Sequence, residues 1–599
     1  MQREGIQAFI TPSTDPHAGE YVPERWKARR WISGFSGSAG TAVVTADQAA
    51  LWTDSRYFIQ ATQQLGGSDF VLMKEKIEGT PTIAQWLSTL LPKGSTAAID
   101  GWVSTVSETE ALRDELRTYG INLRTDLDPY QEIWADRPEA PLSQARIQPL
   151  EYSGEAASSK LCRIRQQIGE AALMVCSLEE IAWTLNIRAD DVAYTPFVLS
   201  YLIITPTEAT LFIYDEKLTP QVRDYLLHEG VATRPYGDIV QAAHQLSLPT
   251  IAEPEKTNFA VYSALPHPVR RPSPISQMLI YKNETEIRCF RSAMEKDGVA
   301  MVKWMKWTLE NVPLGHETEL SLSRKLEELR REQPLCMGIS FETIMGYAHH
   351  GAIVHYDPTP ETDIPVRPEG LLLVDSGGQY LDGTTDITRT LPLGPLTWEM
   401  RRDYTLCLRG FINLGRAVFP RGTCGTQLDT LARMEMWRYG LNYLHGTGHG
   451  VGQYMSVHEA IDLHQFRMQW RPQPLLPGMT ITDEPGIYIE GSHGVRHEDT
   501  MLVVPADFAD EHGRACEPTA SATEPDAAPT QAQGLTFGPY YTFEHLTLCP
   551  ILTSPIITEW LTQEERQWFN RYQQKVFDRL SPLLDDEHTQ WLREATRAI

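Results

Sequence analysis

The chain has 599 residues, of which 42% are hydrophobic and 22% charged, as in an ordinary globular protein. This length is too great for one core, so three or four domains are expected. The formal net charge of −25 argues against nucleic acid as a partner. No apolar run reaches the roughly 18 residues that a membrane span needs, so no membrane association is expected.

The first residues, MQREGIQAFITPSTD, contain no charged region followed by a long apolar stretch, so no secretory signal is predicted. The eight cysteines stand singly, without a CxxC pair, which favours reduced thiols over a disulfide framework. Both observations lead us to expect a cytoplasmic protein.

The N-terminal half contains the same predicted pattern twice. Residues 41–65 are predicted to form strand, tight turn, strand and amphipathic helix, and residues 201–228 repeat that order. This repetition predicts two related α/β domains, at 1–130 and 131–275. Proline-rich segments at 136–144 and 267–276 are predicted linkers.

The third predicted domain, 276–599, contains all the candidate site motifs. Two strand–turn–strand units, at 371–390 and 479–503, are each preceded by helical sequence and could bring four carboxylates to one central sheet. A stretch rich in Pro, Ala, Thr and Asp, 505–536, is predicted to be a disordered insertion. A helical C-terminal extension follows, whose aromatic residues are expected to lie in the core.

Three motifs supply five potential metal ligands. VDSGGQYLDGTTDITRT contains Asp375 and Asp386, HGTGHGVGQYMSVHE contains His449, and TDEPGIYIEGSHGVRHED contains Glu484 and Glu498. Four carboxylates and one imidazole suit a pair of hard or borderline divalent ions better than one zinc. Because paired cations activate water against an unreactive bond, the motifs predict a metallohydrolase.

Each ligand also has a simpler interpretation. Asp375 and Asp386 could be turn residues beside glycine, His449 could be structural, and Glu498 could be a solvated partner of Arg496. The conjunction favours the metal site, because burying four unpaired acids would be costly and a dication removes that cost.

Three further histidines lie near these motifs: His355 in GAIVHYD, His445 at the start of HGTGHG, and His458 in SVHE. Histidine readily donates to a developing oxyanion near neutral pH, so these residues are candidates for proton or oxyanion roles. Taken singly, each is more often a structural residue.

The motifs, with GAIVHY upstream, closely resemble those of the X-Pro aminopeptidase (aminopeptidase P) family of pita-bread-fold metallopeptidases. GEYVPERWKARRWISGFSGSAGTAVVTADQAALWTDSRYFIQA resembles the first domain of the large, three-domain cytosolic form. NIRADDVAYTPFVLSYLIIT resembles its second domain, and YYTFEHLTLCPI its C-terminal extension. The resemblance implies two related α/β domains followed by a catalytic pita-bread domain.

The resemblance also implies a cofactor of two divalent metal ions, most simply Mn²⁺. Asp375 would bind one ion, Asp386 and Glu498 would bridge both, and His449 and Glu484 would complete the second. The implied reaction is removal of the N-terminal residue from peptides with proline in second position, with Glu484 moving the proton of the attacking water.

By the same resemblance, His355 and His458 would contact the scissile carbonyl and the proline side of the substrate. His445 and Arg496 would support the catalytic site, and Arg56 of the first domain would contact substrate. The family suggests a homodimer formed through the catalytic domain.

The chain departs from the family pattern at two places. Ala460 and Ile461 follow SVHE where Gly-Pro is usual, and His497 and Asp499 flank Glu498 where an apolar residue and Asn are more familiar. Two alternatives stay open: a prolidase acting on X-Pro dipeptides, and a pita-bread binding protein without catalysis. The five ligands and the length favour the aminopeptidase.

Overall fold

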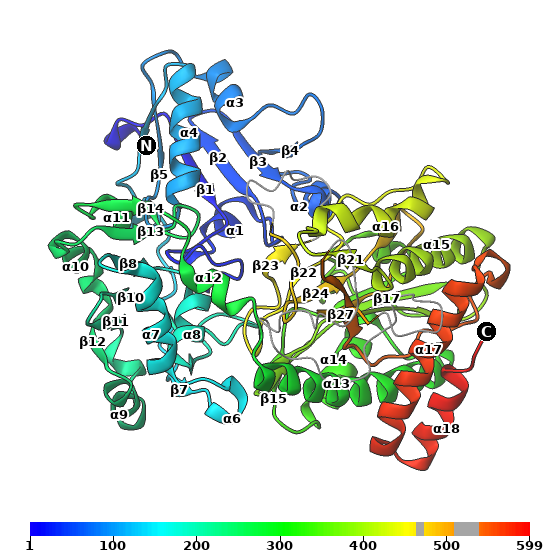
Figure 1. Cartoon of the computed structure of the whole chain (residues 1–599). Helices are drawn as coiled ribbons and strands as arrows, with labels where there is room; N and C mark the ends of the chain where they lie inside the picture. The colour runs from blue at the N-terminus through cyan, green and yellow to red at the C-terminus, as the bar shows by residue number, and fades with distance from the viewer. Residues whose placement is uncertain (463–472, 508–537) are drawn as a thin grey trace. The chain divides into compact units, whose positions relative to one another are not determined.

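The computed structural model describes residues 1–462, 473–507 and 538–599. It divides into two compact units, Met1–Leu279 and Ile280–Ile599 (Figure 1). The domain limits expected at 130/131 and 275/276 stay predictions. Most of the insertion predicted at 505–536 lies outside the described residues.

The first sheet of the N-terminal unit has the strand order β4-β3-β2-β1-β5-β6. β1 pairs antiparallel with β2 and parallel with β5. Apolar side chains of α3 and α4 pack on one face, and those of α1, α2 and α5 contribute to separate clusters. The elements are β1 Ala8–Pro12, α1 Ala28–Ser33, β2 Thr41–Thr45, β3 Ala49–Thr53, α2 Phe58–Gln64, β4 Phe70–Lys74, α3 Ile83–Leu90, β5 Thr96–Ile99, α4 Val106–Thr118, β6 Asn122–Arg124 and α5 Tyr130–Ile133.

The second sheet repeats this topology, in the order β12-β11-β10-β8-β13-β14. Even the hairpin turns match: Thr45 Oγ1 accepts the Gln48 N–H, and Thr205 Oγ1 accepts the Glu208 N–H. The prediction of two related α/β domains is confirmed. The elements are β7 Arg146–Ile147, α6 Leu150–Ser153, α7 Ala157–Ile168, β8 Ala172–Val175, α8 Leu178–Leu185, β9 Ile187–Arg188, β10 Ser200–Ile204, β11 Ala209–Ile213, α9 Pro220–His228, β12 Val231–Pro235, α10 Ile239–Gln245, β13 Thr250–Ala252, α11 Phe259–Ser263, β14 Pro268–Arg270 and α12 Pro274–Leu279.

The linker predicted at 267–276 is wrong. That segment contains the strand β14 and the start of α12. A proline is tolerated at the start of β14 because this strand is the edge of its sheet, where a backbone N–H need not join the ladder.

The loops that follow β5 and β13 pair with each other inside the N-terminal unit. The Val106 N–H donates to Thr257 O (3.0 Å), and the Phe259 N–H donates to Ser104 O (2.9 Å). Between these bonds lie Thr105 and Asn258, the N-caps of α4 and α11. The two related domains therefore meet through equivalent loops.

The C-terminal unit begins with the 28-residue helix α13, capped by Asn283. With α14 it packs against a three-stranded sheet, β16-β17-β20. Helices α15 and α17 share a second core, where Trp568 and Phe569 are buried as expected. The elements are α13 Glu284–Asn311, α14 Glu319–Arg331, β15 Cys336–Ile339, β16 Ile344–Tyr347, β17 Leu371–Ser376, β18 Gly378–Tyr380, β19 Gly383–Thr384, β20 Ile387–Pro392, α15 Trp398–Gly415, β21 Phe419–Pro420, α16 Gly425–Trp437, β22 His449–Gly450, β23 Glu459–Asp462, β24 Thr480–Asp483, β25 Gly486–Ile489, β26 His493–Arg496, β27 Asp499–Pro505, β28 Tyr540–His545, α17 Gln563–Leu580 and α18 Asp586–Ala595.

The predicted hairpin units do not share one central sheet, so that expectation is wrong. The first contributes to β16-β17-β20, whereas the second contributes to β21-β28-β27-β24-β22-β23. A backbone hydrogen bond from the Glu498 N–H to Thr388 O (3.1 Å) connects the two where β20 approaches β27, without a continuous ladder. The acids are thus held by two sheets.

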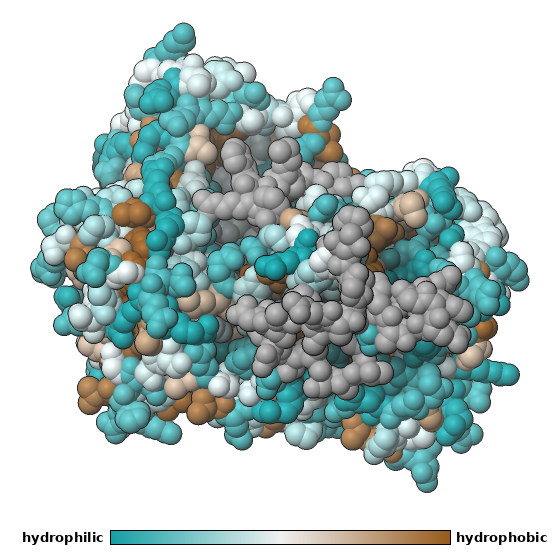
Figure 2. Space-filling view, in the orientation of Figure 1, coloured by the Kyte–Doolittle hydropathy of each residue, from teal (hydrophilic) through white to brown (hydrophobic). Residues whose placement is uncertain are grey.

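The face in Figure 2 is mostly hydrophilic, with small, separated hydrophobic groups. Among the described residues, no helix is long and apolar enough to cross a membrane.

Candidate metal centre

The five predicted ligands lie at strand ends of the C-terminal unit. Asp375 is on β17, Asp386 directly precedes β20, His449 begins β22, Glu484 follows β24 and Glu498 precedes β27. Potential ligand atoms of Asp386, His449 and Glu498 lie within 4.8 Å of one another. His449 Nε2 is also 3.4 Å from Glu484 Oε1. Strands that are far apart in sequence therefore converge on one acidic centre.

The orientation of His449 is fixed by the backbone of the next residue, Gly450. Its Nδ1 lies 2.9 Å from Gly450 O, and because a carbonyl can only accept, Nδ1 is the protonated donor. The opposite nitrogen, Nε2, faces Asp386 Oδ2 at 3.4 Å. A backbone bond that fixes the tautomer and aims Nε2 at the acids is the arrangement expected of a metal-binding histidine.

Neighbouring side chains hold the carboxylates of Asp375 and Glu498, each through one oxygen. Arg496 Nη2 donates to Asp375 Oδ2 (2.6 Å), while Asp375 Oδ1 is buried and has no hydrogen-bond partner among the residues that the structure describes. The Thr388 hydroxyl donates to Glu498 Oε2 (2.6 Å). Arg496 therefore pairs with Asp375, and the interpretation of Glu498 as a solvated partner of Arg496 is wrong, because Glu498 is 1% exposed.

Burial and mutual repulsion raise the pKa values of three of these acids, Asp375, Glu484 and Glu498. Burial raises the pKa of Asp375 to about 6, against the opposing charge of Arg496, and Asp386 and Glu484 add to the rise. Burial and the neighbouring acids also raise the pKa values of Glu484 and Glu498. Burial alone would lower the pKa of His449, but Asp386 and Glu484 raise it to about 9. The centre favours added positive charge.

The donor set fits divalent metal ions. Oxygen donors from four acids and one correctly oriented imidazole suit divalent cations, and Asp375 Oδ1 provides a further ligand atom. Bound cations would also stabilise the carboxylates as anions, which burial alone opposes.

A series of hydrogen bonds runs from Asp375 through Arg496 and Tyr488 to His445. Arg496 Nη1 donates to the Tyr488 hydroxyl (2.6 Å), and that oxygen lies 2.8 Å from His445 Nε2. Since His445 Nδ1 donates to Gly446 O, its Nε2 accepts the Tyr488 proton. His445 and Arg496, both predicted as site residues, are thus connected through Tyr488, which sequence reasoning missed.

The surroundings of the other predicted site residues, His458, His355 and Arg56, are known through single contacts. The His458 ring packs edge-on against His449, with centroids 4.3 Å apart. The carbonyl of Val354, the residue before His355, is 3.5 Å from Arg496 Nη2, so the chain at His355 passes beside the centre. Arg56 belongs to the N-terminal unit, where both its Nε and Nη2 bind Asp54. The roles assigned to all three stay predictions.

A buried ion pair lies next to His458. Lys282, directly before the cap of α13, places its Nζ 2.7 Å from both oxygens of Glu459. The side chains of both residues are 1% exposed. Since Glu459 follows His458 in the chain, this pair ties the His458 turn to the start of α13.

We expect Lys282→Met to destabilise the C-terminal unit by about 3–5 kcal/mol, because it leaves the Glu459 charge buried and unpaired. The double variant Lys282→Met, Glu459→Gln should recover most of that stability, yet keep a reduced kcat because His458 has lost its anchor. Calorimetry and steady-state kinetics on the three proteins test this. Full recovery of kcat in the double variant would show that the pair has no positioning role.

Comparison with known proteins shows the family to which the chain belongs. Family models match residues 288–505 (metallopeptidase family M24), 1–126 and 136–286 (both Creatinase/Prolidase N-terminal domain), and 539–599 (C-terminal region of peptidase M24). Aminopeptidase P2 of Arabidopsis thaliana is 36% identical over 99% of this chain and 86% of its own length. The chain belongs to the Xaa-Pro aminopeptidase P family.

Two further family members, one compared by sequence and one by structure, match nearly the whole chain. A probable Xaa-Pro aminopeptidase P of Talaromyces marneffei is 36% identical, covering 100% of this chain and 91% of its own. The crystal structure of X-prolyl aminopeptidase from Caenorhabditis elegans, described as a cytosolic enzyme with a di-nuclear active site, matches with a TM-score of 0.90 and 31% identity. That match covers 99% of this chain and 95% of the other.

Asp499, directly after Glu498, is held by residues of the C-terminal unit. The Asp499 carboxylate contacts His545 Nδ1 through one oxygen and accepts the Thr547 N–H (2.9 Å) through the other. On the other side of Glu498, His497 packs edge-on against Tyr404. The Asp499–His545 pair anchors β27 to β28 directly after Glu498.

Proposed function

We propose that the chain is a metal-dependent aminopeptidase that removes the N-terminal residue from peptides with proline in second position. The observation that carries this proposal is the convergence of Asp386, His449 and Glu498 within 4.8 Å, with Asp375 and Glu484 beside them. Asp375, Asp386, His449, Glu484 and Glu498 would hold two divalent ions.

Bound cations would supply Lewis acidity, which lowers the pKa of a water and stabilises developing negative charge. Glu484 would take the proton of that water, because burial and its acidic neighbours make it a stronger base than an ordinary glutamate. His355 and His458 would donate to the scissile carbonyl and orient the proline side. Arg496 would hold Asp375, and through Tyr488 also His445.

The substrate assignment has a chemical reason. An X-Pro bond lacks the amide N–H that most peptidases bind, so a dedicated site must position it through the ring and the free N-terminus. An acidic centre suits the cationic α-amine. Arg56 would contribute a further contact to the peptide.

The deciding experiment measures release of arginine from an Arg-Pro-Pro peptide by the purified chain, with Mn²⁺ and with EDTA. An X-Pro dipeptide and a peptide without proline are run beside it. Metal-dependent cleavage of the longer X-Pro peptide supports the proposal. Cleavage confined to the dipeptide would indicate a prolidase, and no cleavage by metal-loaded protein would indicate a binding function.

His458→Ala should lower kcat by about a hundredfold or more, as expected for loss of a positioned proton donor. Metal content should be unchanged, because His458 packs against His449 without replacing it as a ligand. Metal analysis and kinetics measure both quantities, with His349→Ala, an exposed histidine, as the control. Metal loss in the His458 variant would contradict its catalytic role and make it a ligand or structural residue.

We infer that the metal is Mn²⁺ and that the enzyme is cytoplasmic. The oxygen-rich donor set supports Mn²⁺ over zinc. The cytosolic description of the C. elegans enzyme supports the location.

We also propose a homodimer formed through the C-terminal unit. An aromatic patch there consists of Trp398, Trp437, Tyr439 and Trp560, of which Trp398 is 56% exposed. Trp560 packs against Trp398 and Tyr439, with centroids 6.4 and 5.3 Å away. Exposed aromatic clusters are enriched at subunit interfaces, and a two-fold contact would cover the same patch on both copies.

Trp398→Glu should convert the dimer to a monomer, because it introduces a charge at the centre of a contact between like surfaces. The molar mass measured by light scattering after gel filtration should fall from twice the chain mass of 67.7 kDa to the mass of one chain. Trp31→Glu, at an exposed tryptophan of the N-terminal unit, is the control. A dimer that survives the Trp398 substitution would exclude this patch as the interface.

A further inference from the structure

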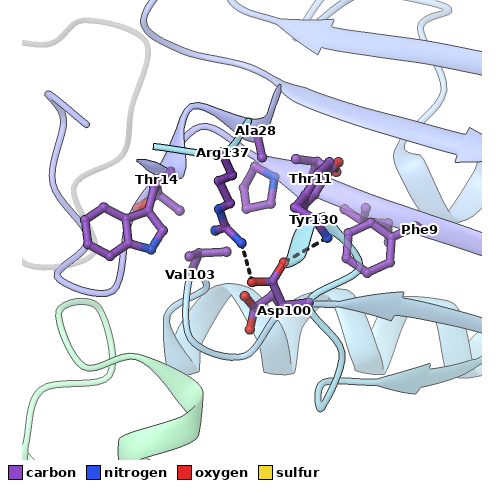
Figure 3. Close-up of a pocket in the computed structure, with 12 residues that line it drawn as sticks. Phe9, Thr11, Thr14, Ala28, Asp100, Val103, Tyr130 and Arg137 are labelled. Carbon is purple, nitrogen blue, oxygen red and sulfur yellow. Dashed lines mark hydrogen bonds and ion pairs between the residues drawn. The ribbon is translucent and has the colours of Figure 1, made fainter. Parts of the chain in front are cut away.

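Glu319, the first residue of α14, is a buried acid with partners unlike those of an ordinary ion-paired acid. In the pocket of the N-terminal unit at the ends of β1 and β5, for example, Arg137 Nη1 lies 2.6 Å from Asp128 Oδ2 (Figure 3). Glu319 is 0% exposed, and among the described residues no lysine or arginine forms an ion pair with it. Since a buried carboxylate is costly unless its oxygens are satisfied, its hydrogen-bond donors carry that burden.

The three donors that the structure gives to the Glu319 carboxylate belong to one short segment. The Tyr347 N–H donates to Oε1 (2.8 Å), and the Tyr356 hydroxyl donates to Oε2 (2.8 Å). His350 Nδ1 lies 2.9 and 3.0 Å from the two oxygens and is the donor, because a carboxylate only accepts. His355 directly precedes Tyr356 in the chain. One carboxylate therefore holds this segment on both sides of His355.

Glu319 itself stands at a firmly held helix start. Thr318 caps α14, where its Oγ1 accepts the Ser321 N–H (3.2 Å). Leu322 and Leu326 of the same helix are buried in the core that α14 shares with α13 and the sheet β16-β17-β20. A side chain on a packed helix holds its partners more precisely than one on a loop.

The same segment is also attached to strands of the metal centre. Ile344 of β16, just before the segment, is the ladder partner of Asp375 on β17. Gly351 packs backbone to backbone against Gly494 of β26, since a Cβ added at Gly494 would lie 1.7 Å from Gly351 O. The chain around His355 is thus held between the start of α14 and the strands that carry the acids.

We propose that Glu319 is a positioning residue, which sets the place of the His355 imidazole at the metal centre without touching the substrate. The inference rests on the proposed peptidase function, in which His355 donates to the scissile carbonyl. Loss of the carboxylate would release the segment on both sides of His355, whereas the metal ligands are held by other elements. A reacting group displaced by about 1 Å can lower the rate by about a hundredfold.

Glu319→Gln should therefore lower kcat on the Arg-Pro-Pro peptide by about a hundredfold and leave the metal content at the wild-type value. The matched control is Asp297→Asn. Asp297 is equally buried and accepts a hydrogen bond from Arg330 Nε of the same helix, α14 (2.7 Å). This substitution should lower thermal stability but leave kcat close to that of wild type. An equal fall in kcat in both variants would reduce Glu319 to a structural residue.

The same substitution in the His355→Ala background distinguishes positioning from general support. If Glu319 acts through His355, Glu319→Gln should lower the residual kcat of His355→Ala by less than about twofold. A fall by the same factor in both backgrounds would overturn the proposal. Tyr356→Phe removes a single donor to the carboxylate and keeps the ring, so it gives the same comparison, with a smaller loss of kcat, if Glu319→Gln does not fold.

A measurement that needs no catalysis separates this inference from the proposed function. In EDTA-treated full-length protein with ¹³C-labelled histidine rings, the NMR signals of His355 and His458 are identified by their absence in the two alanine variants. Glu319→Gln should shift or broaden the His355 signal and leave the His458 signal in place. An unchanged His355 signal would overturn the inference even in an active enzyme. An inactive wild type with the expected change would contradict only the peptidase function.

Discussion

Asp386→Ala should abolish peptide cleavage and reduce the bound metal, because Asp386, whose Oδ2 lies 3.4 Å from His449 Nε2, belongs to the cluster that would hold the ions. We expect kcat to fall by at least about a thousandfold, since bound cations supply several kcal/mol of charge stabilisation. The measurements are kcat on an X-Pro peptide and metal content by mass spectrometry.

Asp382→Asn is the matched control. Asp382 lies four residues earlier on the same hairpin, is 3% exposed, and binds Lys296 outside the ligand set. This substitution should lower thermal stability but leave two ions bound. If Asp386→Ala kept full activity with normal metal content, the assignment of the centre would be wrong.

Removal of the metal should abolish activity and destabilise the C-terminal unit in a pH-dependent way. Burial raises the pKa of Asp375 from the ordinary 3.8 to about 6. A carboxyl with a raised folded pKa binds its proton more tightly when folded. Its stability contribution is therefore complete below the unfolded pKa and lost as the pH rises through about 6.

For Asp375 alone, that loss is on the order of 3 kcal/mol. Bound cations should restore it, because they favour the ionised carboxylates. The difference in unfolding temperature between metal-loaded and EDTA-treated protein should therefore be small near pH 4 and widen toward pH 6, between the two pKa values. Calorimetry across this range measures it.

Asp375→Asn removes the titrating group, so the EDTA-treated variant should show a shallower pH dependence than EDTA-treated wild type. A difference between loaded and EDTA-treated protein that stayed constant from pH 4 to pH 6 would contradict this account of the centre.

The repeated α/β domains could be predicted from sequence because their signals are local. Short apolar runs on both sides of the turns at Thr45 and Thr205 specify two similar hairpins. The separation of the catalytic strands into two sheets could not be predicted, since it depends on how β20 and β27 approach each other. The segment at 267–276 was mistaken for a linker because its prolines indicate a break, whereas an edge strand can contain them.

The clustering of the acids around His449 could be predicted because these residues stand in dense motifs. Their supports could not, because these come from distant positions. Lys282 meets Glu459 across 177 residues, and the Thr388 hydroxyl reaches Glu498 across 110. Tyr488 offers only a weak signal, as the one ring in an otherwise apolar strand four residues after Glu484.

The mutual pairing of the loops after β5 and β13 has an evolutionary consequence. Two copies of one fold that meet through the same loop, at Thr105 and Asn258, are the expected product of a tandem gene duplication. After such an event, one copy can keep an ancestral feature while selection on the other is relaxed. The matching turns at Thr45 and Thr205 would then be a feature that both copies kept.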